Sequence, residues 1–348
     1  MTATQLPIVD VGAMFGDAAE RRALAEQVTS ICHEIGFMLI VDHGVDQQLI
    51  DDVFDLMARF FALPEADRQL IDKRESPWFR GWESVGTEYT NGRPDIREQI
   101  DLWTEWPVRE LDVEPSYLRL LGPNQWMPEA VLPGARELMG EWYHQMGGLA
   151  DRLLGLLALG LGLDEQHIVR LFGDEPMSLT KLIHYPPTPA GGAGVNAHHD
   201  AGFLTLLAPG VTPGLEVEMP DGSWTPVPSV PGSLVVNLGE VLQGMTGKYL
   251  VATPHRVITA EERFSAGYFH GPSLDVRLDP LPLDPSYAAA VAGSPRHRGA
   301  GFMARAEETS AGVGDMQSDH RAETYGEQLW NYFTRSYADM MSRHHSDA

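Results

Sequence analysis

The first 175 residues show mainly the spacing of amphipathic helices. Apolar residues recur three or four positions apart in the segments 19–35, 46–61 and 134–160, and this spacing predicts three helices. Gly36 ends the first helix, and the apolar run FMLIVDHG after it predicts a buried strand. The segment 76–107 is aromatic, charged and rich in turn residues, so no regular element is predicted there.

After Met177 the pattern changes to short apolar or alternating runs that are separated by Pro and Gly. The runs typical of β-strands are SLTKLIHY, FLTLLAP, GLEVEM, SWTPVP, SLVVNLG, HRVIT and RFSAGYFH. Short strands about ten residues apart predict a β-sandwich or barrel. Residues 279–319 are rich in Pro, Gly and Ala and predict a long irregular loop, and residues 322–343 predict a closing helix.

These changes of pattern divide the chain into four segments. We expect an N-terminal region over 1–110, a helical segment over 111–176 that packs on the core, a β core over 177–280, and an irregular loop with a C-terminal helix over 281–348. The predicted fold class is therefore mainly β with flanking helices.

Composition and charge narrow the range of partners. Of 348 residues 43% are hydrophobic, which is enough for a large core and excludes a mostly disordered chain. A net charge of −24 repels phosphate backbones and anionic lipid heads, so we expect neither nucleic acid nor a membrane as a partner. Cys32 is the single cysteine and lies in an apolar helical pattern, which predicts a buried thiol. With no basic leader and no apolar run of about 18 residues, we expect a cytoplasmic protein.

Three residues have the spacing of a metal site. In NAHHDAG, just before the strand FLTLL, His198 and Asp200 are two positions apart, so in an extended chain they face one side while His199 faces the other. His255 opens another strand 55 residues beyond Asp200. Two histidines and one carboxylate on one face, with other coordination positions open, suit a non-haem Fe(II) centre for oxygen chemistry. On spacing alone, a pair of buried structural histidines is an equally good interpretation.

A third element, eight residues past His255, favours the metal interpretation. Arg263 and Ser265 share one face of the strand RFSAGYFH, where they offer a guanidinium fork and a hydroxyl. Such a pair binds a carboxylate through two parallel hydrogen bonds, which a lysine cannot do. Most arginines lie at the surface, but the apolar strand around Arg263 argues against that position here.

The order of these motifs resembles a known family. An HxD motif, a histidine 55 residues later and an RxS motif, joined by GLEVEMPDGSWTPVPSVPGSLVVNLGEVL, are similar to the Fe(II)/2-oxoglutarate-dependent oxygenases of the isopenicillin N synthase-like family. LPIVDV, GFMLIVDHGV and RGWESVG resemble the N-terminal region of that family, and residues 178–275 resemble its catalytic core. The resemblance covers nearly the whole chain and implies a distorted double-stranded β-helix, or jelly roll, flanked by helices.

The resemblance also implies roles for individual residues, with Fe(II), 2-oxoglutarate and O2 as the cofactor and cosubstrates. The implied ligands of Fe(II) are His198, Asp200 and His255. The implied partners of the distal 2-oxoglutarate carboxylate are Arg263, Ser265 and Tyr185. For Tyr185, a core aromatic at a strand end is an equally good interpretation. Asn237 and Glu240 follow an inner strand, and we interpret Asn237 as a support for the metal ligands and Glu240 as structural.

Within the family, several stretches resemble most the bacterial ethylene-forming enzyme, among them GTEYTNGRPD, ERFSAGYFHGP and TYGEQLWNYFTRSY. By position, Glu88 and Arg335 would match residues around the arginine substrate of that enzyme. Two departures point to a different substrate: Ala201 stands in place of a tyrosine after the ligand aspartate, and Lys181 in place of an arginine near the cosubstrate. The predicted substrate contacts are Arg80, Glu88, Tyr89 and Arg335, with Phe79, Trp82 and Trp103 as further candidates.

We therefore expect an oxidoreductase that uses O2 and 2-oxoglutarate to oxidise a small molecule, such as an amino acid or a natural-product intermediate, with release of succinate and CO2. Hydroxylation is the expected outcome, and a place in specialised metabolism follows from family analogy alone. Three alternatives stay open: an isopenicillin N synthase-like oxidase that needs no 2-oxoglutarate, an ethylene-forming type, and a non-catalytic jelly-roll ligand sensor. A zinc hydrolase is less consistent with the sequence, which has no HExxH motif.

Overall fold

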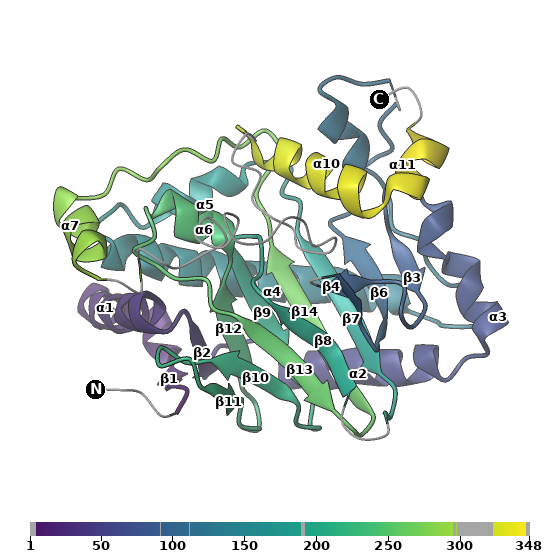
Figure 1. Ribbon diagram of the computed structural model, residues 1–348, viewed down its shortest axis with the longest axis horizontal. Helices are drawn as coiled ribbons and strands as arrows, with labels where there is room; N and C mark the ends of the chain where they lie inside the picture. The colour runs from purple at the N-terminus through teal and green to yellow at the C-terminus, as the bar shows by residue number, and fades with distance from the viewer. Residues whose placement is uncertain are drawn as a thin grey trace.

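The computed structural model describes residues 5–90, 92–110, 112–188, 192–294, 297 and 323–345. In this part of the chain two β-sheets face each other (Figure 1). The larger sheet has eight strands, in the order β1 (Ile8–Asp10), β2 (Phe37–Val41), β12 (Leu234–Leu238), β9 (Leu204–Ala208), β14 (Arg263–His270), β7 (Leu179–Tyr185), β6 (Glu98–Trp103) and β3 (Gly81–Glu83). The smaller sheet has four, in the order β11 (Trp224–Pro226), β10 (Leu215–Glu218), β13 (His255–Thr259) and β8 (Gly192–His198). A separate ribbon joins β4 (Tyr89–Thr90) and β5 (Arg93–Pro94).

The path of the chain through these sheets is that of a jelly roll. From β7 to β14 consecutive strands alternate between the larger and the smaller sheet, except that β10 and β11 are neighbours in the smaller one. β1 and β2 are parallel, and the other paired strands of the described residues are antiparallel. The predicted fold class, mainly β with flanking helices around a distorted double-stranded β-helix, is confirmed.

Helices cover the outer face of the larger sheet and one end of the molecule (Figure 1). The helices of the described segments are α1 (Ala18–Glu34), α2 (Gln47–Phe61), α3 (Glu65–Arg68), α4 (Ala135–Gly160), α5 (Gln166–Val169), α6 (Glu240–Met245), α7 (Pro285–Gly293), α10 (Tyr325–Ser336) and α11 (Ala338–His344). Short 3-10 helices are η1 (Gly12–Phe15), η2 (Gln69–Ile71), η3 (Lys73–Glu75), η4 (Ser116–Leu120) and η5 (Arg170–Phe172). The three helices predicted from apolar spacing are confirmed as α1, α2 and α4.

Aspartates begin the first two of these helices. The Asp17 carboxylate accepts hydrogen bonds from the backbone N–H groups of Ala19 and Glu20. The Glu20 carboxylate in return accepts from the N–H of Asp17, which completes a capping box. Asp46 caps α2 in a similar way through the N–H of Gln48. Each cap satisfies donors that have no partner in the first helical turn, a contribution of about 1 kcal/mol.

The larger sheet carries apolar side chains on both faces, and this produces two cores. In β9, Leu204 and Leu206 point to the core under the helices, on the side of α4, whereas Leu207 points to the smaller sheet. Cys32 of α1 is buried in the core under the helices, as predicted, and burial raises the pKa of its thiol to about 12. The space between the two sheets is less completely filled, and cavities remain there.

Strand β6 corrects the prediction that segment 76–107 has no regular structure. It is buried at every position and pairs with both β7 and β3. Its polar residues resemble those of a loop, but Glu98 contacts the ring of His184, and Asp101 on the opposite face lines a polar cavity. The sequence pattern fails here because polar positions on this strand face polar groups instead of solvent.

Strand β8 is not among the strands predicted from the sequence, because its glycines and alanines have a weak preference for strands. Its sequence GAGVNAH pairs with β13 through an irregular register. Gly194 has a packing reason, because a Cβ at that position would lie 2.5 Å from the ring of Tyr185. Contacts with the rest of the fold therefore decide the strand in spite of its weak propensity.

The C-terminal helix differs from the prediction of one helix over 322–343. The structure has α10 and α11, which are separated at Tyr337, whose φ of −130° and ψ of 46° are not helical. Part of the predicted irregular segment 279–319 forms α7, and most of the remainder lies outside the described residues.

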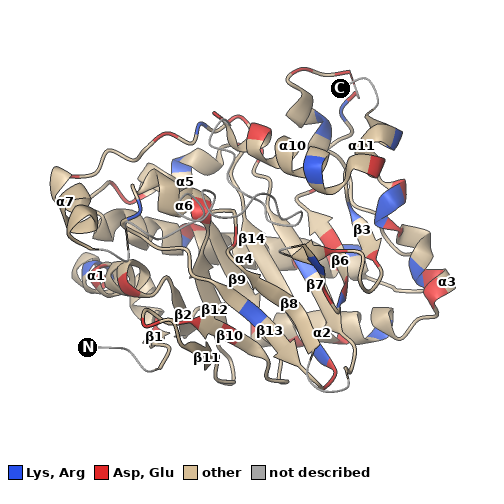
Figure 2. Cartoon of the chain, in the orientation of Figure 1, with Lys and Arg blue, Asp and Glu red and all other residues tan. Residues whose placement is uncertain are grey.

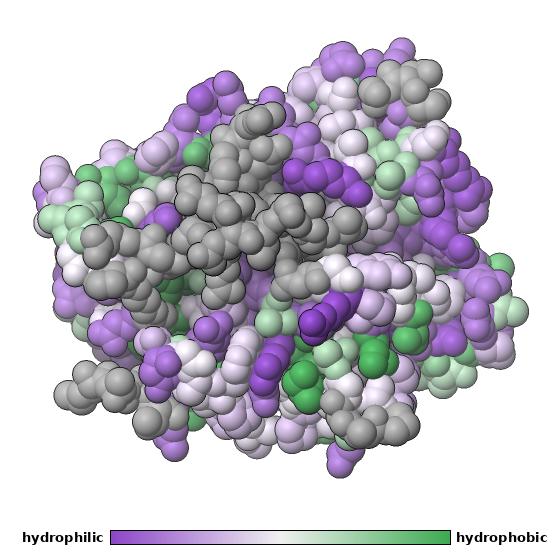
Figure 3. Space-filling model, viewed as in Figure 1, coloured by the Kyte–Doolittle hydropathy of each residue, from purple (hydrophilic) through white to green (hydrophobic). Residues whose placement is uncertain are grey.

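The face of the molecule in Figure 3 is mostly hydrophilic, with small separate hydrophobic groups. Basic and acidic residues are spread over many elements, as Figure 2 shows. None of the described helices is both long and apolar enough to cross a membrane.

Replacing Gly36 with alanine should destabilise the protein strongly. Gly36 has a φ of +72°, and a Cβ there would lie 2.0 Å from the carbonyl oxygen of Val251. Gly134 is a matched control, since its φ is +71° but a Cβ would meet nothing within 4 Å. We expect Gly134→Ala to lower the free energy of unfolding by about 1 kcal/mol through backbone strain, and Gly36→Ala by about 1–3 kcal/mol more. Urea unfolding measures both, and equal effects would contradict the close approach of Gly36 to Val251.

Candidate metal centre and active site

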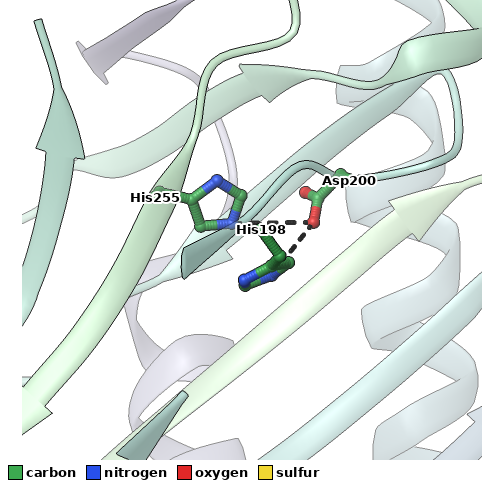
Figure 4. Close-up of side chains that lie close together, drawn as sticks. All are labelled: His198, Asp200 and His255. Atoms are coloured by element: carbon green, nitrogen blue, oxygen red, sulfur yellow. Dashed lines mark ion pairs between the residues drawn. The ribbon is translucent and has the colours of Figure 1, made fainter. Parts of the chain in front are cut away.

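Three side chains from the end of β8, the connection after it and the start of β13 converge between the two sheets (Figure 4). One ligand atom from each of His198, Asp200 and His255 lies within 4.8 Å of the other two. Asp200 Oδ1 is 3.7 Å from His198 Nε2 and 3.6 Å from His255 Nε2. Metal–ligand bonds of about 2.0–2.2 Å place ligand atoms roughly 3 Å apart, so a small closure of this group would surround one ion. Among the described residues, no other group of His, Cys, Asp and Glu converges in this way.

Backbone carbonyls fix the orientation of both imidazole rings. His198 Nδ1 lies 2.9 Å from the carbonyl oxygen of Asn196. His255 Nδ1 lies 3.1 Å from the carbonyl oxygen of Thr253. Because a carbonyl can only accept, each Nδ1 carries a proton, and each Nε2 is the ring nitrogen directed toward Asp200.

The carboxylate of Asp200 is held from one side only. Its Oδ2 accepts hydrogen bonds from Thr205 Oγ1 at 2.5 Å and from Asn237 Nδ2 at 2.6 Å, which leaves Oδ1 facing the histidines. Asn237 thus makes the supporting contact predicted for it, whereas nothing in the sequence indicated Thr205. Glu240 donates its backbone N–H to the carbonyl oxygen of Asp200 at 2.8 Å, in line with a structural role.

Both sheets are needed to assemble this group. His198 ends β8 and His255 begins β13, and the two residues are directly paired in the smaller sheet. Asp200 lies in the connection from β8 to β9. Its partners Thr205 and Asn237 are themselves paired across β9 and β12 of the larger sheet. The fold therefore places a ligand pair on one sheet opposite a hydrogen-bonding pair on the other.

Burial and mutual charge set the protonation of the group. Burial, with the neighbouring His255 ring, lowers the pKa of His198 to about 3. For Asp200, burial raises the pKa, but the two histidines and the hydrogen bonds from Thr205 and Asn237 outweigh it and hold the pKa below its usual value. At neutral pH the site presents a neutral imidazole at His198 and a carboxylate at Asp200, the forms that bind metal ions.

One cavity beside the group contains an unpaired guanidinium. Arg263 is 1% exposed, and it donates from Nη1 to Ser265 Oγ and from Nη2 to the carbonyl oxygen of Pro209, both at 3.1 Å. The ring of Tyr185 lies 5.0 Å from the guanidinium carbon, and Arg263 Nε is buried without a partner. No described carboxylate pairs with this charge, which would favour a bound anion.

A second cavity also reaches His198 and Asp200, and it has an aromatic wall and a charged wall. The aromatic residues are Trp103 of β6, Phe269 of β14, Tyr332 and Phe333 of α10, and Tyr337. The C-terminal helix α10 thus forms part of the wall, although it lies more than a hundred residues from Asp200 in the sequence.

Five charged side chains of the second cavity form a connected network. Arg97 Nη2 lies 2.5 Å from Glu88 Oε2, and Lys181 Nζ lies 3.1 Å from Glu88 Oε1. Asp101 is 3.2 Å from Lys181 Nζ and 2.7 Å from Lys73 Nζ. For four of them burial opposes the charged form, but the opposite charges outweigh it, so the pKa values of Arg97, Lys181 and Lys73 are raised and that of Glu88 is lowered.

Of the four predicted substrate contacts, Glu88 lines this cavity and the other three do not. Arg80 is completely buried and donates to backbone carbonyls, so it holds loops together. Tyr89 is 45% exposed on β4, and Arg335 is exposed on α10. The structure therefore does not bring Arg80, Tyr89 and Arg335 to the site.

Among the further candidates, Trp103 lines the cavity, whereas Phe79 stacks on Phe333 and Trp82 donates to Glu98 outside it. Sequence reasoning missed Arg97 and Asp101. The available signal was the alternation in REQIDLW, which places Arg97, Asp101 and Trp103 on one face of an extended chain.

A jelly roll with two histidines, one carboxylate and adjoining cavities is the arrangement of the non-haem Fe(II) oxygenases. The chain matches the model of the non-haem dioxygenase N-terminal region (described for morphine synthesis) over residues 6–129 and that of the 2OG-Fe(II) oxygenase superfamily over residues 176–272. This chain belongs to the Fe(II)/2-oxoglutarate-dependent dioxygenases, and its cofactor and cosubstrate are Fe(II) and 2-oxoglutarate.

Individual relatives agree with this membership. A 2-oxoglutarate-dependent dioxygenase of Gibberella zeae is 34% identical over 79% of this chain and 73% of its own length. The 2-oxoglutarate-dependent dioxygenase frbJ of Dothideomycetidae sp. is 30% identical over 83% of this chain and 80% of its own. The crystal structure of JOX2 with 2OG, Fe and JA is 26% identical, with a TM-score of 0.67 over 80% of this chain and 78% of JOX2. The predicted family and enzyme class are confirmed, and the nearness to the ethylene-forming enzyme stays a prediction.

The metal-free protein should lose stability as the pH falls below about 6.5. An unfolded histidine takes up a proton near its ordinary pKa of 6.5, whereas folded His198, with a pKa of about 3, does not. The unfolded state therefore binds more protons in this interval, and stability that is complete above it declines as the pH falls. Urea unfolding between about pH 7 and pH 4 should show a shallower decline for His198→Gln than for the exposed control His144→Gln. Parallel declines would contradict the lowered pKa.

Proposed function

We propose that this protein hydroxylates a small molecule with O2 and 2-oxoglutarate, and that succinate and CO2 are released. The main support is that two histidine Nε2 atoms and Asp200 Oδ1 converge at a point reached by two separate cavities. One cavity holds the unpaired Arg263, and the other has aromatic and charged walls. A cosubstrate and a substrate can therefore occupy different sides of one metal ion, which brings the reacting groups together.

His198, Asp200 and His255 would hold Fe(II). Two imidazole nitrogens and one carboxylate oxygen suit this ion, and the hydrogen bonds to Nδ1 and Oδ2 keep the free ligand atoms aimed at one position. When bound, Fe(II) and 2-oxoglutarate supply the oxidation, in which one oxygen atom of O2 enters succinate and the other enters the product. The chain itself fixes the direction of the ligands and limits access of water.

Arg263, Ser265 and Tyr185 would bind the distal carboxylate of 2-oxoglutarate. Arg263 Nη1 and Ser265 Oγ are 3.1 Å apart, close enough to bind the same carboxylate group. Tyr185 packs against the guanidinium and is itself buried, so it restricts the position of Arg263. Binding of the dianion would neutralise a charge that the described residues leave unpaired.

The second cavity would bind the prime substrate, an amino acid or a natural-product intermediate. Glu88 contributes to its charged wall, while the positions of Arg80, Tyr89 and Arg335 give no support to a substrate contact. The cytoplasmic location and the absence of nucleic-acid and membrane partners stay predictions from sequence and charge.

Replacing His198 or His255 with alanine should abolish turnover and most of the iron binding, because each removes one of three ligand atoms. His144→Ala on the exposed face of α4 is a matched control. Anaerobic Fe(II) titration should give one ion per chain for the native protein and the control. Full activity in either ligand variant would contradict the proposal, and iron-dependent O2 consumption without succinate would favour an oxidase that needs no 2-oxoglutarate.

Replacing Arg263 with lysine should raise the KM for 2-oxoglutarate by roughly tenfold to a hundredfold, because an ammonium group cannot form two parallel bonds to a carboxylate. Arg256→Lys is a suitable control, since Arg256 pairs with Glu216 and lies over Trp224, outside both cavities. Initial rates of succinate formation against 2-oxoglutarate concentration give both KM values. An unchanged KM in Arg263→Lys would remove Arg263 from the cosubstrate site.

A further inference from the structure

The carboxylate oxygens in the charged wall of the substrate cavity are already occupied by donors from the protein. Glu88 Oε1 accepts from Lys181 Nζ at 3.1 Å, and Glu88 Oε2 accepts from Arg97 Nη2 at 2.5 Å. Lys181 Nζ also lies 3.2 Å from both oxygens of Asp101, and Lys73 Nζ lies 2.7 Å from Asp101 Oδ2. A cationic ligand would have to compete with these buried cations for the same carboxylates.

The unpartnered polar atoms of the same wall are donors. Arg97 is 9% exposed and Trp103 is 3% exposed, and both Arg97 Nε and Trp103 Nε1 are buried without a hydrogen-bond partner. A guanidinium N–H and an indole N–H can only donate. A ligand with hydrogen-bond acceptors would satisfy them, whereas a further donor would not.

The charge of the wall points in the same direction. Away from the metal centre this wall carries three cations and two carboxylates, so it has one cation in excess, and Asp200 at the metal centre balances the complete lining in a chain whose net charge is −24. Glu83 pairs with Lys73 and Asp95 pairs with Arg97, but neither carboxylate lines the cavity. Figure 2 shows basic and acidic segments together along β6 and β7, where this network lies.

Arg97 also lies between the two cavities, because it lines both of them. Asp95 is 3.2 Å from Arg97 Nη2 and accepts from Asn196 Nδ2 at 3.1 Å. The carbonyl oxygen of the same Asn196 is the acceptor for His198 Nδ1 at 2.9 Å. A group bound at Arg97 is therefore held at a fixed position relative to the metal centre, as selective oxidation of one C–H bond requires.

We infer that the prime substrate carries a carboxylate that binds Arg97 and Lys181, while its carbon skeleton packs against Phe269, Phe333 and Trp103. This inference rests on the proposed function and names the class of its substrate, a small carboxylic acid with an apolar or aromatic body. In the free enzyme Glu88 bridges the same two cations, so Glu88 competes with the substrate carboxylate. If a cationic group of the substrate bound Glu88 instead, replacing Glu88 with glutamine would raise the KM, whereas the carboxylate inference predicts a lower KM.

The first test uses the full chain with Fe(II) and 2-oxoglutarate. Small carboxylic acids, each beside its methyl ester and primary amide, are compared for stimulation of succinate formation and for the rise in melting temperature that they cause. We expect acids to give both signals and their neutral partners to give neither. Stimulation by esters, amides or amines but by no acid overturns the inference, as does a panel in which no acid gives either signal.

The slow turnover of 2-oxoglutarate without any substrate is measured in the same assay. It distinguishes a failure of the carboxylate inference from a failure of the proposed function. If this background succinate formation depends on Fe(II) while acids and esters stimulate it equally, the proposed function stands and the carboxylate inference fails. If the protein forms no succinate under any condition, the proposed function fails and the inference fails with it.

Variants of the wall give the second test. Arg97→Gln should raise the KM of the best acid by roughly tenfold to a hundredfold and abolish the rise in melting temperature, since a charge-assisted hydrogen bond is lost. Arg93→Gln is the matched control, because Arg93 is an exposed arginine of the adjacent strand β5. Glu88→Gln should lower the KM, because it frees both cations.

The KM is expected to rise in Arg97→Gln and to fall in Glu88→Gln, so the test stays decisive even if Arg97→Gln does not fold. An acid that loses its turnover in Glu88→Gln, or an unchanged KM in folded Arg97→Gln, overturns the inference. A lower KM in Glu88→Gln supports it without any contribution from Arg97 variants.

Discussion

The pairing of β13 with β8 is the constraint on which the site depends. It places His255 opposite His198 in the smaller sheet, and the larger sheet supplies Thr205 and Asn237, which hold one oxygen of Asp200. Each ligand atom is therefore directed by a hydrogen bond to a different part of the fold, and the ligand group keeps its shape only while both sheets keep their register. The two cavities are the unfilled space that this facing of sheets leaves around the group.

The same division of faces explains how an acidic chain can hold three buried cations in one cavity wall. On β6 and β7 the inward residues include Asp101 and Lys181, and burial makes each charge dependent on an opposite partner. Lys181 and Asp101 are paired across the two strands, and Lys73 joins them from η3. Such a network is costly to build unless its members are paired, and here each of the five charged side chains has an opposite partner.

The far end of the chain closes this arrangement. Lys73 donates to the Tyr337 hydroxyl at 2.8 Å and lies 4.2 Å from the centre of its ring, which attaches the C-terminal helices to the charged network. Phe333 of α10 stacks on Phe79 with ring centroids 4.2 Å apart and lines the cavity on its other side. In the proposed function, substrate selection would therefore be distributed over the β6–β7 pair and the C-terminal helices, while the candidate metal ligands belong to the β core.

The sequence by itself determined the elements whose apolar spacing faces an apolar core: α1, α2, α4 and the strands after Met177 other than β8. It also determined the HxD, histidine and RxS residues, because alternation in a strand fixes which side chains share a face. Only the tertiary structure decided β6, β8 and the substrate wall, since polar residues that face a polar cavity have the same local pattern as a solvated loop. Arg80 and Arg97 show the limit of prediction from sequence, because both lie in the same charged segment. Arg80 donates to backbone carbonyls in the interior, whereas Arg97 lines both cavities.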